Sequence, residues 1–149
     1  MQKKIKRILF IGLGGAGQRH LRLFKENLKD EDVEFLAYRS TNKTPFLNPD
    51  FSVNQEESLE GAYGIKVYND FNKALALKPD LAVISTPSSM HLKYAQLCAE
   101  KNIDVFVEKP LSSSTKGLQK LKQTVEKKKV AIQVGFQRRF HPQLGRVND

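Results

Sequence analysis

A short apolar run that ends in closely spaced glycines is the feature that most constrains this chain. Residues 8–11 are Ile-Leu-Phe-Ile, and Gly12, Gly14 and Gly17 follow them in the spacing GxGxxG. This pattern is typical of a buried strand, a tight turn and the start of a helix. The first glycine permits the turn, the second lets a pyrophosphate approach the backbone, and the third lets helix and strand pack closely. Alone it is a weak signal, since many glycine-rich turns match it.

The size and the cysteine content indicate one intracellular domain. The chain has 149 residues, of which 40% are hydrophobic, enough for one domain with its own core. Its one cysteine, Cys98, has no partner for an internal disulfide and no nearby Cys or His with the spacing of a zinc site, so no bound metal is expected. We therefore expect a reducing, cytoplasmic location and a buried, structural thiol.

No targeting or membrane segment is expected. Basic residues precede the apolar run, as in a signal peptide, but glycines interrupt that run and it is needed as the first strand. No stretch approaches the roughly 18 apolar residues of a membrane span. The sequence therefore predicts no membrane partner.

The net charge of +9 raises the hypothesis of nucleic-acid binding. Lysines at 120, 122 and 127–129 are its best support, but they alternate with Leu118, Leu121 and Val125. That spacing is typical of the exposed face of an amphipathic helix. No aromatic interleaving or DNA-binding motif accompanies the lysines, so no nucleic-acid partner is expected. A basic surface would also attract an anionic dinucleotide or sugar nucleotide.

Predicted strands and helices alternate along the chain. The strands are expected at residues 8–11, 33–38, 65–68, 81–85, 103–107 and 130–136. The helices are expected at 16–29, 55–62, 71–75, 88–102 and 114–128, with Ser88 or Ser89 as a cap of the fourth. Right-handed crossovers then give an α/β fold with a doubly wound parallel sheet in the order 3-2-1-4-5-6. Ligands of such sheets lie over the carboxyl ends of the strands.

The end of the second strand is where such a fold contacts the adenosine ribose. Tyr38, Arg39 and Ser40 stand there, and no acid follows before Asp50. A carboxylate would bind a free 2'-hydroxyl, whereas Arg39 and Ser40 suit a 2'-phosphate. We therefore expect NADP to be preferred, with NAD possible. The alternative, that Arg39 stacks on the adenine, would suit either cofactor.

The connection over residues 41–63 is longer than a compact unit needs. It is rich in polar residues and contains Pro45 and Pro49. A lid, a partner surface and an inert insertion all fit this composition.

Four motifs together make the chain resemble the Gfo/Idh/MocA family of nicotinamide-dependent oxidoreductases. They are GLGGAG with His20 just after it, TPSSMH at residues 86–91, VFVEKPLS at 105–112, and VGFQRRFHP at 134–142. EKP directly after a strand is the most specific of them. The motifs stand in the family's order and cover nearly the whole chain. The resemblance implies a Rossmann dinucleotide-binding domain.

The resemblance also assigns residues to the cofactor. The pyrophosphate would be held by Gly12, Leu13, Gly14, Gly15, Ala16 and Gly17, and the ribose would lie at Arg39 and Ser40, beside Tyr38. Towards the nicotinamide and the substrate it implies Thr86, Pro87, His91, Glu108, Lys109, Pro110, Gln137 and Arg138. Lys109 is the implied catalytic residue, because an ammonium beside a reacting hydroxyl stabilises an alkoxide or helps to move its proton.

Plainer roles remain open for several of these side chains. His91 could be an ordinary first-turn residue of its helix, and His20 is expected to pack or hydrogen-bond beneath the glycine loop rather than to react. Arg138 and Arg139 could be solvated charges beside the last strand. Outside this motif Lys109 would be an ordinary surface lysine.

The family carries a second, mainly antiparallel domain that supplies the substrate pocket and the usual oligomer interface. This chain ends just after the first domain, so we expect a fragment, a proteolysed remnant or a truncated product with little turnover by itself. The resemblance implies hydride transfer to or from a sugar or cyclitol, in a homo-oligomer when full-length. A non-catalytic dinucleotide-binding regulatory module is the alternative, although it has no need of Glu108, Lys109 and Pro110.

Overall fold

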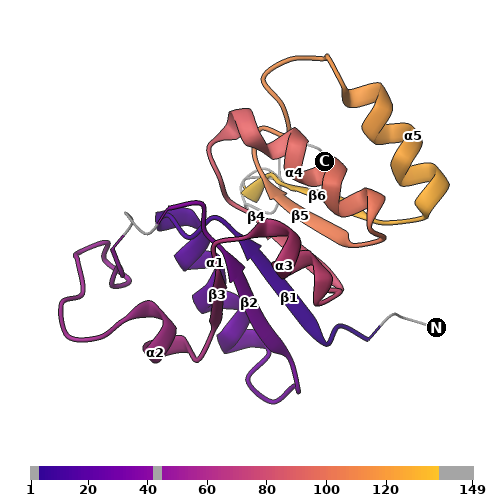
Figure 1. The fold of residues 1–149 in the computed structure, drawn as a ribbon. Coiled ribbons are helices and arrows are strands. Elements are labelled where there is room, and N and C mark those ends of the chain that lie inside the picture. Colours follow the sequence, from indigo (N-terminus) through magenta and orange to yellow (C-terminus); the bar gives the residue numbers. More distant parts are fainter. Residues whose placement is uncertain (1–3, 42–44, 138–149) are drawn as a thin grey trace, which may run out of the picture.

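The computed structural model describes residues 4–41 and 45–137, which form a single six-stranded sheet (Figure 1). All neighbouring strands are parallel. Their order is β3-β2-β1-β4-β5-β6, which confirms the predicted topology. The strands are β1 (Arg7–Ile11), β2 (Glu34–Tyr38), β3 (Lys66–Tyr68), β4 (Leu81–Ile84), β5 (Asp104–Glu108) and β6 (Ile132–Gly135).

Helices cover both faces of the sheet and make a three-layered α/β domain. One face packs against α3 (Phe71–Ala76), α4 (His91–Glu100) and α5 (Leu118–Lys128). The other packs against α1 (Gly15–Asn27) and α2 (Leu59–Tyr63). A short 3-10 turn, η1 (Ser88–Met90), precedes α4.

The central strand β1 lies at the middle of this core. Its residues Ile8, Leu9, Phe10 and Ile11 are fully buried. Ile8 and Phe10 pack on the α1 side, whereas Leu9 and Ile11 pack on the α4 side. A strand that is buried on both faces needs an unbroken apolar run, which explains why the sequence shows no alternation here.

Three helix starts differ from the sequence prediction. α4 begins at His91, and its N-cap, Met90, makes no side-chain hydrogen bond. Capping by Ser88 or Ser89 was therefore a wrong prediction, because both serines lie inside the 3-10 turn. α5 begins four residues late, after Gly117, whose φ of 88° lies in the left-handed region. α2 begins after Ser58, whose hydroxyl accepts a hydrogen bond from the Gly61 amide.

Cys98 and the lysines take the structural roles expected of them. Cys98 is fully buried, and desolvation raises the pKa of its thiol to about 12, so the reactive thiolate form is suppressed.

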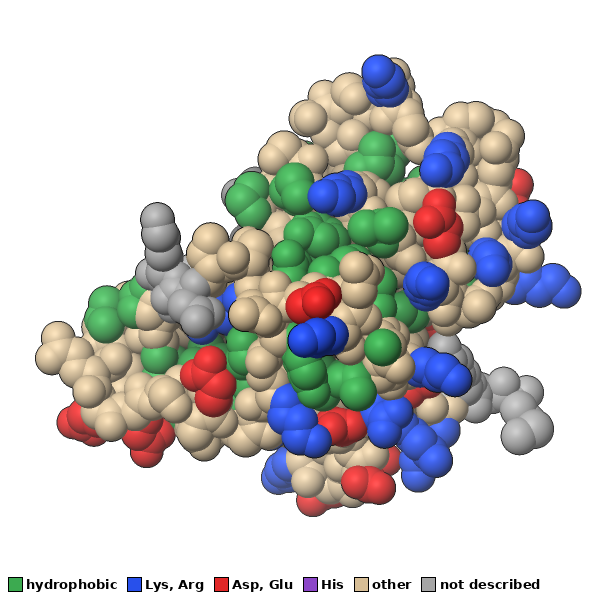
Figure 2. Space-filling model, viewed as in Figure 1, with side chains coloured by type: hydrophobic (Ala, Val, Ile, Leu, Met, Phe, Trp, Pro, Cys, Tyr) green, Lys and Arg blue, Asp and Glu red, His purple; other side chains and the backbone are tan. Residues whose placement is uncertain are grey.

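The lysines of α5 lie on the outer surface, where Figure 2 shows basic side chains interspersed with acidic ones. Within the described ranges, no helix is both long and apolar enough to span a bilayer.

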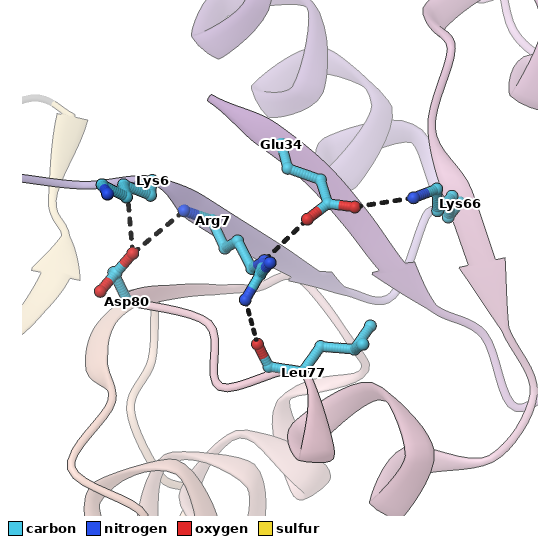
Figure 3. A network of polar contacts seen from close by, with 6 residues as sticks. All are labelled: Lys6, Arg7, Glu34, Lys66, Leu77 and Asp80. Atoms are coloured by element: carbon cyan, nitrogen blue, oxygen red, sulfur yellow. Dashed lines mark hydrogen bonds and ion pairs between the residues drawn. The ribbon is translucent and has the colours of Figure 1, made fainter. Parts of the chain in front are cut away.

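Polar contacts join the amino ends of four neighbouring strands (Figure 3). The Asp80 carboxylate accepts hydrogen bonds from the amides of Lys6 and Arg7, at 2.9 and 3.0 Å. The Arg7 side chain donates to Glu34 at 2.7 Å and to the Leu77 carbonyl at 2.9 Å. Lys66 Nζ donates to the other oxygen of Glu34 at 2.9 Å. This network therefore ties β3, β2, β1 and the start of β4 together at one edge.

The pairing of Glu34 predicts a pH-dependent contribution to stability. Hydrogen bonds from Lys66 and then Arg7 lower the pKa of Glu34 below its ordinary value of 4.5. The ionised carboxylate therefore stabilises the fold above that pH, and this contribution is lost as the pH falls through the folded-state pKa. We expect Glu34→Gln to lower the free energy of unfolding at pH 7 by less than about 1 kcal/mol, because the pair is solvent-exposed.

Urea unfolding at pH 7 and pH 3 measures this effect. The loss of unfolding free energy in Glu34→Gln, relative to the wild type, should be smaller at pH 3 than at pH 7. Glu57→Gln, which removes the same charge outside the network, is the matched control. A deficit of equal size at both values of pH would contradict the prediction.

Candidate dinucleotide site at the carboxyl edge of the sheet

The strand ends opposite this network meet at the carboxyl edge of the sheet. The Gly12 amide donates to the Tyr38 carbonyl at 3.1 Å, and the Ser85 amide donates to the Ile11 carbonyl at 2.9 Å. The loops that follow β1, β2 and β4 are therefore held side by side. The sequence predicted that the candidate segments would share this edge, and the strand order confirms it for the described segments. Arg138 and Arg139 lie outside the described residues.

The glycines after β1 leave bare backbone where a phosphate could approach. Gly12 has a φ of 88°, in the region that favours glycine. A Cβ on Gly17 would collide with the Gly12 carbonyl, so the helix can approach the strand only without a side chain there. A Cβ on Gly14 would meet no described atom within 4 Å. The loop is therefore closed on its inner side and open at Gly14.

The amino end of α1 lies at this opening. Gly14 is its N-cap, no side chain among the described residues caps the helix, and its first turn contains no acidic residue. The free amides and the helix dipole therefore favour an anion at this end. Leu13 is buried in the core, whereas Ala16 is exposed at the opening. This arrangement fits the pyrophosphate of a dinucleotide.

Two buried hydroxyls lie beneath the same loop. Ser85 Oγ and Thr86 Oγ1 are buried, and neither has a hydrogen-bond partner among the described residues. A Cβ on Gly12 would lie 3.0 Å from Thr86 Cγ2. Buried polar groups usually have partners, and unpartnered ones call for an explanation such as a bound water or ligand. The hydroxyls are a second observation that fits a polar ligand at this edge.

A cleft of about 330 Å³ joins the glycine loop to the loops after β4 and β5. It is lined by Ala16, Arg19, Ser85, Thr86, Ser88, His91, Glu108, Lys109 and Gln137. A larger hollow of about 570 Å³ lies near Asp80 and Lys101, away from these loops. We place the candidate site in the smaller cleft, because it is lined by Ala16 of the first turn of α1 and by Ser85 and Thr86, whose hydroxyls have no partner among the described residues.

Glu108 at the end of β5 turns back towards α1. His20 Nε2 lies 2.7 Å from Glu108 Oε1, and Arg19 Nη2 lies 3.5 Å from the same oxygen. The His20 ring also packs edge-on against Phe106, with 5.1 Å between ring centroids. His20 therefore packs and hydrogen-bonds, as the sequence predicted, but these contacts are with β5 rather than with the glycine loop. Lys109 is exposed, beside this anchored carboxylate.

His91 joins the loops that follow β4 and β5. Its ring is 2% exposed. Nδ1 lies 2.8 Å from the Pro110 carbonyl oxygen, and Nε2 lies 2.7 Å from the Thr86 carbonyl oxygen. The peptide bond between Lys109 and Pro110 is cis. The imidazole thus holds the two loops at a fixed separation, while Pro87 is exposed beside it.

The three residues at the end of β2 point in different directions. Tyr38 packs in an aromatic cluster with Phe71 and Tyr94, with ring centroids 5.1 and 6.0 Å away. Arg39 is only 8% exposed, and its Nη1 lies 4.0 Å from Glu60 Oε1. Ser40 is exposed. Contacts of these residues with an adenosine ribose stay a prediction.

Some residues fall outside the sequence prediction or outside the described ranges. Gln137 is exposed at the cleft, whereas Arg138 lies outside the described residues. Sequence reasoning missed Glu60 as the neighbour of Arg39. It also missed Gln18, a fully buried amide beside the glycine loop. A polar residue on the apolar side of α1 was the available signal for Gln18.

Comparison with protein families gives one match that covers most of the chain. Residues 6–136 match the family model GFO_IDH_MocA, described as an oxidoreductase family with an NAD-binding Rossmann fold.

Known relatives agree with that match. The chain is 32% identical to inositol 2-dehydrogenase of Rhodococcus jostii over 137 residues, which are 90% of this chain and 34% of the relative. It is 29% identical to the rhizopine catabolism protein MocA of Rhizobium meliloti over 144 residues, 96% of this chain and 41% of the relative. The chain thus spans less than half the length of either relative.

A solved structure has the same fold. Scyllo-inositol dehydrogenase from Lactobacillus casei, solved with NAD(H) and scyllo-inositol bound, superimposes with a TM-score of 0.76 at 21% identity. The match covers 97% of this chain and 40% of that protein.

Proposed function

Since this chain belongs to the Gfo/Idh/MocA family of oxidoreductases and forms its NAD-binding Rossmann domain, we propose that it holds the dinucleotide for hydride transfer to or from a sugar or cyclitol. The observation that carries the proposal is the open backbone at Gly14, at an uncapped helix end, on the same sheet edge as Lys109.

The glycine loop would hold the pyrophosphate. Amides of residues 14–17 at the start of α1 would donate to its oxygens, and the bare Gly14 backbone leaves room for close approach. The unpaired hydroxyls of Ser85 and Thr86 would find polar partners beside it. The fold positions these groups before any ligand arrives, so little ordering is needed on binding.

Lys109 would act at the end of the site where the hydride is transferred. A bound nicotinamide would supply the hydride acceptor or donor. During oxidation, the neutral amine of Lys109 would accept the proton of the substrate hydroxyl as the hydride leaves for the nicotinamide. During reduction, the Lys109 ammonium would give this proton back to the carbonyl oxygen of the substrate. Glu108 and His91 would fix the backbone on either side of Lys109, through α1 and through the Pro110 carbonyl. Gln137 and Arg138 would face the substrate.

The substrate pocket and assembly are further proposals. Because the relatives are about two and a half to three times as long as the aligned region, we propose that a second domain completes the pocket. The names of the relatives favour an inositol or a related sugar as the substrate. A homo-oligomer in the cytoplasm, without a nucleic-acid partner, remains our expectation. A non-catalytic module would not need Lys109 in the cleft.

For the cofactor, NAD binding is the family's property, and a preference for NADP is our proposal. Support comes from the end of β2, where Arg39 and Ser40 stand in place of an acid. Glu60 lies 4.0 Å from Arg39 and offsets part of its charge. The preference is therefore expected to be modest.

Gly14→Asp separates folding from dinucleotide binding. Aspartate is a favoured N-cap, and no described atom lies within 4 Å of the added Cβ, so the variant should fold. Its carboxylate would repel the pyrophosphate. We expect NADH affinity, measured by fluorescence titration, to fall at least about 100-fold. Gly14→Asn, which adds the same shape without the charge, is the control. Unchanged binding by Gly14→Asp would contradict the proposed phosphate site.

Lys109→Met tests the catalytic proposal. In a protein that carries both domains, we expect turnover of inositols or sugar nucleotides to fall by about 100-fold or more. The dissociation constant for NADH should change by less than about tenfold. Lys93→Met, which alters an exposed lysine of α4, is the control. Full turnover by Lys109→Met would rule out the role in proton handling.

The NADP preference depends on Arg39. We expect the wild-type chain to bind NADPH more tightly than NADH, and Arg39→Met to lose about tenfold in NADPH affinity with a smaller loss for NADH. Glu60→Gln should shift the ratio of the two affinities towards NADPH, because it removes the charge that offsets Arg39. Isothermal titration with both dinucleotides measures these constants. Tighter binding of NADH by the wild type would refute the preference.

A further inference from the structure

The long connection between β2 and α2 contains an ordered segment that neither the family motifs nor the proposed mechanism uses. Residues 45–54, here called the strap, run outside the sheet beside α1 (Figure 1). An antiparallel bridge pairs Leu47 with Val53. The Asn48 amide donates to the Ser52 carbonyl at 2.9 Å, and the Phe51 amide donates to the Asn48 carbonyl at 2.9 Å. The strap is therefore a closed turn with its own hydrogen bonds.

Gln18 fastens the strap to the glycine loop. Its Nε2 donates to the carbonyls of Leu13 at 3.0 Å and Pro45 at 2.8 Å. Its Oε1 accepts from the Leu47 amide at 2.8 Å. The side chain is fully buried, so each of these bonds replaces one that water would otherwise make. One amide thus sets the position of the strap relative to the loop that faces the phosphate.

Arg22, one turn further along α1, adds a second attachment. Its Nη1 donates to the Leu47 carbonyl at 3.1 Å. Leu47 is thereby bound through both its amide and its carbonyl to side chains of α1. The helix that begins at the glycine loop therefore also carries the strap.

These attachments place Phe51 beside the open end of the glycine loop. The ring lies 3.2 Å from the position of a Cβ on Gly15, whereas a Cβ on Gly14 next to it would meet no described atom within 4 Å. Phe51 is 56% exposed and has a φ of 69°. A large apolar side chain in the left-handed region, exposed to water, has no role in the core that would explain it.

We propose that Phe51 contacts the bound dinucleotide and that Gln18 is its positioning residue. The ring would form a wall beside the pyrophosphate and the adenosine ribose, where it packs on the ligand and excludes water from the phosphate hydrogen bonds. This inference rests on the proposed function, since it requires a dinucleotide at Gly14. It would make Phe51 a preformed part of the binding site, with the strap as the support that holds it.

Phe51→Ala is the direct test, because a half-exposed side chain can be removed without opening a core cavity. We expect its dissociation constants for NADH, NADPH and ADP-ribose to rise by about tenfold each, because all three share the adenosine diphosphate portion. Val53→Ala removes an equally exposed apolar side chain from the same strap. It should bind as the wild type does, and both variants should keep the wild-type unfolding temperature.

Gln18→Ala and the double variant test the positioning role. If Gln18 acts through Phe51, the double variant should bind no more weakly than the weaker single variant, whereas independent effects would add. The Leu47 amide should also exchange its hydrogen faster in Gln18→Ala, because its acceptor is gone. If the losses of affinity in the two single variants add up in the double variant, the positioning role of Gln18 is overturned.

The outcomes separate this inference from the proposed function. Wild-type affinity in Phe51→Ala would overturn the role of the strap alone. Equal losses of affinity in Phe51→Ala and Val53→Ala would also overturn it, because a general loosening of the strap would then explain both. A wild-type chain that binds none of the three ligands would overturn the proposed function and this inference with it.

Discussion

The close approach of α1 to the end of β1 is the constraint on which the site depends. A side chain at Gly17 would strike the carbonyl of Gly12, so only a glycine lets the helix start at this distance from the strand. That distance determines where the free amides of α1 point and where Gln18, Arg19 and His20 lie on its next turn. Through these three side chains, the same helix holds the strap and the carboxylate of Glu108. The glycine loop, the strap and the end of β5 therefore share one support.

The two edges of the sheet are used differently. At the amino edge the polar groups satisfy one another, as the carboxylates of Asp80 and Glu34 are matched by backbone amides, Arg7 and Lys66. At the carboxyl edge the helix end is uncapped, and the hydroxyls of Ser85 and Thr86 have no partner within the described ranges. A parallel sheet brings all its strand ends of one kind to one edge. The carboxyl edge, where we propose the ligand, is thus the one at which the fold leaves polar groups without a partner among the described residues.

The sequence predicted those features of the fold that depend on short-range sequence patterns. Unbroken apolar runs marked β1 and β4, and the alternation with helices gave the strand order. Capping by Ser88 or Ser89 failed because the chain makes a 3-10 turn there, and local propensity does not distinguish that turn from a first helical turn. The position of Gln18 on the apolar side of α1 was a signal, but its partners were out of reach of the sequence. Pro45 and Leu47 approach Gln18 only through the folded path of the strap. The pairing of Arg39 with Glu60 likewise depends on where α2 packs.

The geometry around Lys109 explains why binding and catalysis would be coupled in this domain. The residue before it, Glu108, is held by His20 and Arg19 of α1, and the residue after it, Pro110, is held by His91 at the start of α4. His91 also contacts the Thr86 carbonyl, in the loop that lies beneath the glycine turn. A shift of α1 that altered the proposed phosphate contacts would therefore also act on Glu108, the residue before Lys109. Because these contacts are already formed in the structure, a dinucleotide bound at the amino end of α1 would meet Lys109 in place, with no separate conformational step.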